Sequence, residues 1–320
     1  MNLASVEKVA NAVLYEGYLL YPYRANSTKN RQRWNFGTLY PRAYAESLSG
    51  AEPCSFHAEF LARGAREAQI EVRFRFLQFV ESARESHAGP DAGAESQSWH
   101  EGLERNVDIA PVSLDALLHA ASESRFEVND VYPPEESGKQ REISGVIRLR
   151  AEPVADAVYR VALNVTNTTD FNPGSGRNAA LLHALVSAHA IVQASSGELI
   201  SLLDPPEELR ERVAGCRNAG VFPVLAGEPG RRDTMLISPI ILYDYPQVAP
   251  ESSGDFFDAT EIDEMLTLRV LTLTEEEIEQ MRRTDPRGHE ICERIRELPE
   301  EQRLKMHGAI RSLRRGREQP

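Results

Sequence analysis

Acidic side chains gather in one stretch of the sequence, ILYDYPQVAPESSGDFFDATEIDE, from residue 241 to residue 264. Carboxylates supply general acid–base catalysis and the oxygen ligands of Ca²⁺ sites, so this stretch is the first place to look for chemistry. It contains no basic residue, and its candidate acids are Asp244, Glu251, Asp255 and Asp258. Their order fits no EF-hand loop, and the spacing from Asp258 to Glu261 is that of a helix capping box. We interpret the stretch as a solvated acidic loop that leads into a helix.

Asp244 is the best single candidate for a functional acid. It follows an apolar and aromatic run, so we expect a partly buried carboxylate with a hydrogen-bonding role. Two carboxylates perform acid–base catalysis only when burial or a neighbour raises the pKa of one of them. An enzyme of unknown reaction, with a polar cleft between two domains near Tyr243 and Asp244, is therefore one hypothesis for this chain.

A glycine pattern superficially resembles a dinucleotide-binding fingerprint. Gly174-x-Gly176-x-x-Ala179 precedes a helical pattern, and Glu198 lies 22 residues beyond Gly176. In the true fingerprint the glycines directly follow a parallel strand, whereas TTDFNP intervenes here and the preceding strands look antiparallel. A glycine-rich linker between domains is the preferred interpretation.

The cysteines and histidines show no spacing typical of a metal site. Cys54, Cys216 and Cys292 are far apart without a C-x-x-C pair, and we expect them to pack as small apolar side chains. His183 and His189 would point about 120° apart on one helix, so they form no ligand pair. The sequence also lacks G-x-S-x-G, H-E-x-x-H and the P-loop. We expect neither a metal nor a cofactor.

The segment from residue 17 to residue 45, called here the basic-aromatic segment, contains five basic residues, seven aromatic residues and no acid. Tyrosine, tryptophan and arginine dominate the hot spots of protein interfaces, and they also stack on nucleic-acid bases. Three interpretations remain open: internal packing, a protein interface and an anionic ligand site. The residues predicted to bind a partner are Tyr21, Tyr23, Arg24, Arg31, Arg33, Trp34, Tyr40 and Arg42.

Apolar periodicity predicts the elements that must position these residues. After a short helix at 5–14, apolar and polar residues alternate over 70–80, 141–150 and 156–167, which is typical of half-buried strands. We therefore expect an antiparallel β-sandwich or sheet from about residue 52 to residue 170.

The second half of the chain has a different pattern of apolar and polar residues. Residues 176–194 are apolar almost all round, which predicts a buried helix, and 205–215 read as a helix opened by proline. Short strands are expected at 221–227 and 234–245. The predicted class is α+β: a β-rich domain over 1–172 with the basic-aromatic segment, and a mixed α/β domain over 173–320 with the acidic loop and C-terminal helices.

Composition limits the classes of partner. The 320 residues carry 36 Lys and Arg against 49 Asp and Glu, a formal net charge of −13 that repels nucleic acid and anionic membranes. No apolar run approaches the ~18 residues of a spanning helix, and the N-terminus does not read as a secretory leader. We expect a cytoplasmic protein without membrane insertion.

Three long strings carry a family resemblance: VANAVLYEGYLLYPYR, SSGELISLLDPPEELRERVAGCRNAGVFPVLAGE and RDTMLISPIILYDYPQVAPESSGDFFDATEIDEMLTLRVLTLTEEE. With them the chain resembles a bacterial family encoded beside high-affinity, oxygen-tolerant uptake [NiFe]-hydrogenases of actinobacteria and acidobacteria. The resemblance is weakest at residues 85–140. It implies an accessory role by protein binding, in the assembly, maturation or stabilisation of a hydrogenase subunit, with that subunit or another maturation protein as partner. It transfers no catalytic residue.

Overall fold

The computed structural model describes residues 4–15, 36–81, 100–128, 142–247 and 293. The chain divides into two compact units, one made of residues 1–18 and 34–247 and the other of residues 19–33 and 248–320. All described residues except Glu293 belong to the first unit. The account below therefore concerns the first unit.

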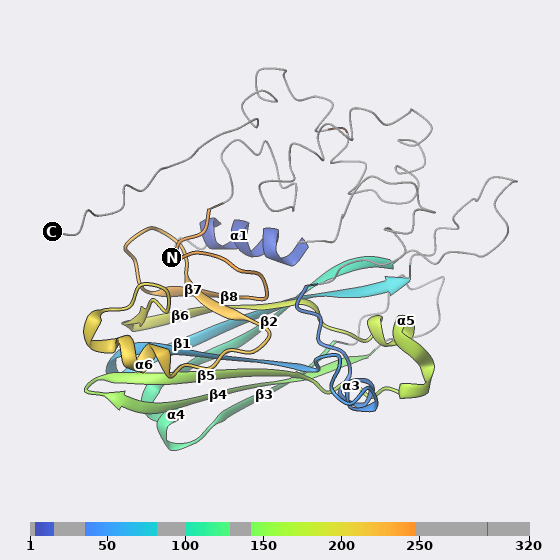
Figure 1. Cartoon of the computed structure of the whole chain (residues 1–320), viewed down its shortest axis with the longest axis horizontal. Helices are drawn as coiled ribbons and strands as arrows, with labels where there is room; N and C mark the ends of the chain where they lie inside the picture. The colour runs from blue at the N-terminus through green and yellow to red at the C-terminus, as the bar shows by residue number, and fades with distance from the viewer. Residues whose placement is uncertain (1–3, 16–35, 82–99, 129–141, 248–292, 294–320) are drawn as a thin grey trace, which may run out of the picture. The chain divides into compact units, whose positions relative to one another are not determined.

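The described residues form short helices around long strands (Figure 1). The α-helices are α1 (Ala4–Tyr15), α3 (Arg42–Ser47), α4 (Leu114–His119), α5 (Gly176–Leu181) and α6 (Arg210–Ala214), and the 3₁₀ turns are η1 (Pro173–Ser175) and η2 (Glu207–Leu209). The strands are β1 (Ser55–Glu81), β2 (His100–Ser113), β3 (Ser122–Val128), β4 (Ile143–Ala155), β5 (Val158–Asn167), β6 (Val186–Ile200), β7 (Phe222–Leu225) and β8 (Thr234–Ser238).

The strands form one sheet in which every pairing is antiparallel. Seven follow the order β3-β4-β5-β1-β6-β8-β7, and β2 also pairs with β1. The antiparallel sheet expected from the alternating pattern is confirmed. A dinucleotide site built on a parallel βαβ unit finds no support among these strands, because a six-residue helix follows the glycines and no described strand pair is parallel.

The 27-residue strand β1 is shared by two parts of this sheet. Residues 55–63 pair with β5 and residues 69–81 pair with β2, while β6 runs along the opposite side of 61–77. We call β3, β4, β5 and residues 55–63 the first half-sheet. The second half-sheet comprises β2, residues 69–81, β6, β8 and β7.

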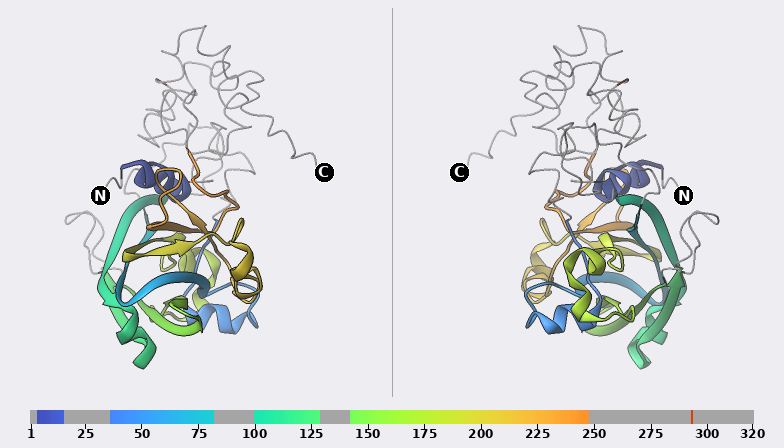
Figure 2. Two further views of the ribbon diagram at one scale, coloured as in Figure 1. Left: turned by 90° about the vertical axis from the view of Figure 1, so that its left-hand side faces the viewer. Right: turned by 90° about the vertical axis from the view of Figure 1, so that its right-hand side faces the viewer.

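A sharp bend in β1 packs the two half-sheets against each other. Phe56 and Phe74 would lie about 60 Å apart in a straight strand at ~3.3 Å per residue, yet their ring centroids are only 6.2 Å apart. Phe126 of β3 joins them, 5.8 Å from Phe74. The inner faces of both half-sheets and two leucines of α4 thus enclose one apolar core, and Figure 2 shows the sheet curving around it.

Two glycines allow the chain to turn at this bend. The pairing of β1 with β6 shifts register between Gly64 and Gln69, so the intervening residues form a bulge. Gly64 faces Gly197 of β6, and a Cβ on Gly64 would lie 3.1 Å from the Gly197 Cα. Larger residues at this pair would separate the two strands at the point where the sheet bends.

Helix α1 covers the outer face of the second half-sheet, above β6, β1 and β8 (Figure 1). Its buried residues, Val6, Val9, Ala10, Val13 and Leu14, recur at the spacing of one helical stripe. Its polar side is tied to β1 by hydrogen bonds from Arg73 to Glu7 and from Arg75 to Asn11. The outer face of the first half-sheet carries polar and charged side chains, and it holds the candidate site described below.

Two expectations for residues beyond 170 need correction. The buried helix predicted over 176–194 is wrong, because only α5 is helical and β6 begins at Val186. A strand buried on both faces, here between the core and α1, loses the alternation that identifies a strand. The sheet also continues across the boundary expected at 172–173, since β5 and β6 both pair with β1. The helices expected near the C-terminus lie outside the described residues.

Candidate functional site

The register of the first half-sheet brings polar side chains into rows on its outer face. His57 of β1 lies opposite Asn164 of β5, Asn164 opposite Arg148 of β4, and Arg148 opposite Glu123 of β3. The next row toward the end of β5 places Thr166 opposite Val146, and Val146 opposite Arg125. Side chains within a row are neighbours in an antiparallel sheet, so residues more than 100 positions apart in the sequence are close together.

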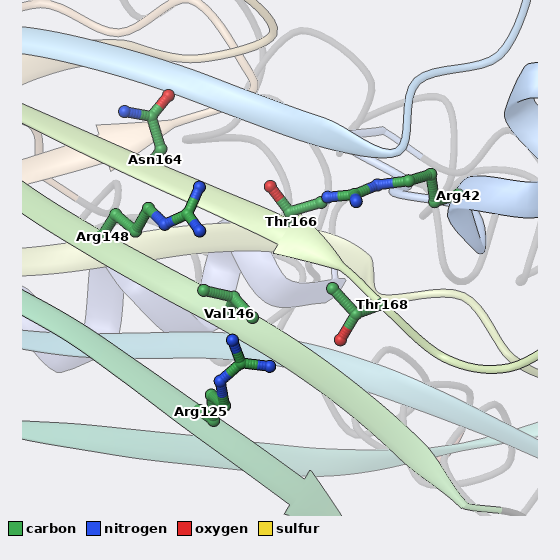
Figure 3. A pocket seen from close by; sticks show the side chains of 7 residues that line it. All are labelled: Arg42, Arg125, Val146, Arg148, Asn164, Thr166 and Thr168. Carbon is green, nitrogen blue, oxygen red and sulfur yellow. The ribbon is translucent and has the colours of Figure 1, made fainter.

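A groove of about 380 Å³ lies over these rows (Figure 3). Its lining residues are Arg42, Arg125, Val146, Arg148, Asn164, Thr166 and Thr168. In Figure 3 the side chain of Arg42 runs from α3 toward β5, while Arg125 and Arg148 come from β3 and β4. Three guanidinium groups, two hydroxyls and one amide therefore surround a space lined by no carboxylate. We call it the arginine groove.

One glutamate neutralises part of this positive charge. Glu123 accepts a hydrogen bond from Arg125 Nη2 and one from Arg148 Nε, each at 2.7 Å. The hydrogen bond from Arg148 is the main reason that the pKa of Glu123 is below its usual value. Among the described residues, no carboxylate forms an ion pair with Arg42. The three arginines and Glu123 together carry two net positive charges.

The position of Arg42 is fixed by the chain on either side of it. Leu39 pairs with Leu185, and the buried side chain of Asn167 donates to the carbonyls of Leu39 and His183 at 2.9 Å. Tyr40, only 2% exposed, then anchors the start of α3. The last residue of β5 thereby holds α3 against the strand whose side chains line the groove.

A chain of hydrogen bonds connects the groove to the neighbouring strand. Asn164 Oδ1 lies 2.8 Å from His57 Nδ1, and His57 Nε2 lies 3.2 Å from Glu59 Oε1. The other carboxylate oxygen of Glu59 accepts from the Arg217 backbone N–H at 2.8 Å and lies 3.8 Å from Arg160 Nε. His57 and Glu59 are only partly exposed, so this chain has a defined geometry.

Of the residues predicted to bind a partner, the structure places only Arg42 and Tyr40. Arg42 is exposed and lines the groove. Tyr40 is buried against Tyr44, under the guanidinium of Arg177, and burial raises its pKa to about 12. It supports the packing of α3 and is absent from the surface, which corrects its assignment. Tyr21, Tyr23, Arg24, Arg31, Arg33 and Trp34 lie outside the described residues.

Asp244 has a structural position. Its carboxylate accepts hydrogen bonds from the Ser201 hydroxyl and, at 2.8 Å, from the Leu225 backbone N–H. Ser201 Oγ in turn accepts from the N–H groups of Leu203 and Asp204. Asp244 therefore fastens the segment after β8 to β7 and to the turn after β6. Glu251, Asp255 and Asp258 lie outside the described residues.

Sequence reasoning missed six of the seven residues that line the groove. The one available signal was the polar side of β4 and β5, where Arg148, Asn164 and Thr166 alternate with buried residues. Within the described ranges, no three His, Cys, Asp or Glu residues are grouped to hold a metal ion. Cys54 and Cys216 are half-buried free thiols rather than fully buried ones.

No protein-family model and no curated protein sequence matches this chain significantly. In the part of the chain that the structure describes, no helix is both long and apolar enough to cross a membrane.

Proposed function

We propose that this chain is an accessory protein that acts by binding a partner protein, in the assembly, maturation or stabilisation of a [NiFe]-hydrogenase subunit in the cytoplasm. The hydrogenase part of the proposal rests on the resemblance of the three long sequence strings. The binding part rests on the arginine groove, which is the observation that carries the proposal.

The groove has the composition of a recognition site. Arginine presents several donors in a planar fork and pairs with carboxylates in two-point contacts, so it is frequent in protein interfaces. None of the seven lining residues is a carboxylate, histidine, cysteine or lysine that would move a proton or attack a substrate. This composition favours binding over turnover.

The alternative was an enzyme with a polar cleft near Asp244. One oxygen of this carboxylate accepts a hydrogen bond from the Ser201 hydroxyl and the other accepts one from the Leu225 backbone N–H, so its observed contacts hold the chain together. No contact among the described residues favours this alternative.

The test is co-purification from cells that express the hydrogenase. The tagged full-length chain is expected to retain a hydrogenase subunit or a maturation protein, identified by mass spectrometry, and a tagged subunit is expected to retain the chain in the reverse experiment. The same purification from cells lacking the hydrogenase genes is the control. If neither direction recovers the other protein, the hydrogenase-associated function is wrong.

A further inference from the structure

We infer that the arginine groove binds carboxylate side chains of an extended acidic segment of a partner protein. This inference deepens the proposed function and rests on it. It assigns a ligand chemistry to the groove.

The contacts of Glu123 indicate that the groove suits carboxylates. This side chain takes a guanidinium donor from Arg125 on one oxygen and a donor from Arg148 on the other, both at 2.7 Å. Two arginines of the groove are thus already arranged around a carboxylate supplied by the protein. Arg42 faces the same space without a carboxylate from any described residue, so a ligand carboxylate has an unused guanidinium to meet.

The size and construction of the groove favour a chain segment over a single small anion. Its volume of about 380 Å³ is more than ten times the ~30 Å³ of one water molecule in the liquid. The arginines come from three separate elements, α3, β3 and β4.

The experiment measures binding of a fluorescently labelled hexaglutamate peptide to the full-length chain by anisotropy at neutral pH. The peptide is ionised there because glutamate has a pKa of about 4.3. Arg42→Gln should weaken binding about three- to tenfold. Arg150→Gln, two residues beyond Arg148 on the same strand face, is the matched control and should change little.

Equal binding by Arg42→Gln and wild type would place the peptide elsewhere and overturn the groove assignment.

Two competitors identify the ligand class. Inorganic phosphate, a single-stranded oligonucleotide and unlabelled hexaglutamate each compete with the labelled peptide. If phosphate or the oligonucleotide displaces the peptide at a lower concentration than hexaglutamate does, the groove is a phosphate site and the acidic-segment proposal is wrong. Peptide binding without recovery of any hydrogenase protein would leave this inference intact and reject the proposed function. If Arg42→Gln recovered a hydrogenase subunit at the wild-type level, the proposed function would stand and the inference about the arginine groove would be rejected.

Discussion

His189 is a single buried side chain that makes the stability of this fold depend on pH. It is fully buried on β6, where its Nδ1–H donates to the Ser187 carbonyl at 2.7 Å, and its Nε2 has no partner among the described residues. Burial, together with the positive charge of Arg75, lowers the pKa of His189 to about 3. The folded protein therefore keeps this ring neutral at pH values where an exposed histidine is charged.

We predict that the first unit loses stability as the pH falls below about 6.5. The unfolded chain binds a proton at His189 with an ordinary pKa of ~6.5, whereas the folded chain resists protonation down to about 3. The contribution of neutral His189 to the free energy of unfolding is complete above pH 6.5 and is lost progressively as the pH falls from 6.5 to about 3. The expected slope from this residue is about 1.4 kcal/mol per pH unit.

Urea denaturation at pH 7, 6 and 5 measures this slope. His189→Phe keeps a ring at the site without a titrating group, so the difference in slope between wild type and variant isolates His189. A variant that loses stability with pH as steeply as wild type would contradict the assignment.

At the level of single residues, the sequence predicts little of the candidate site. Arg42 was named for its aromatic neighbours, not for the groove, and Arg125, Arg148 and Asn164 were not named. These side chains come from separate elements, and only the register of β3, β4 and β5 brings them together. That register joins strands that are distant in the sequence, and the alternation within one strand does not identify its partner strand.

Among the elements, the strands of the first half-sheet were predictable and β6 was not. Residues 143–155 and 158–167 have one polar and one apolar face, and the alternation identified them as strands. Nine consecutive residues from Val186 to Ala194 are buried in β6, which no period distinguishes from a buried helix. Helix α1 was predicted correctly at 5–14 because it has a single apolar stripe.

The pairing of β3 with β4 depends on one glycine, which gives a prediction for this element. Gly145 lies directly opposite Phe126, and a Cβ on Gly145 would lie 2.2 Å from the ring. We expect Gly145→Ala to lower the free energy of unfolding by about 1–3 kcal/mol, because the ring must leave its place beside Phe74 and Phe76.

Urea denaturation checks this value against Gly174→Ala, which adds the same methyl group where the nearest atom is 3.4 Å away. The double variant Gly145→Ala with Phe126→Leu should lose less stability than the two single changes added together, since each removes part of the same clash. Simple additivity would mean that the ring does not restrict this glycine.

For the molecule as a whole, the shared strand β1 makes the two half-sheets depend on each other. Both pair with β1 and both contribute to one core, so neither retains its apolar contacts when the other opens. We predict that amide hydrogens of β4–β5 and of β6–β8 exchange with opening free energies within about 1 kcal/mol of each other.

Hydrogen exchange followed by mass spectrometry tests this dependence. Gly64→Ala, which crowds the bend in β1, should reduce the protection of both half-sheets by the same amount. Exchange of one half-sheet at a free energy several kcal/mol below the other would show that they open separately.

The sharing of β1 also governs how the chain folds as it leaves the ribosome. This strand is complete at residue 81, but β5 begins at residue 158 and β6 at residue 186, roughly a hundred residues later. At ~5–20 residues per second, the apolar side chains of β1 wait about 5–20 s for their final partners. The first unit therefore cannot fold progressively behind the growing chain. Until β6 has been synthesised, the edge of β1 that pairs with it lacks this partner strand, and such an edge favours aggregation.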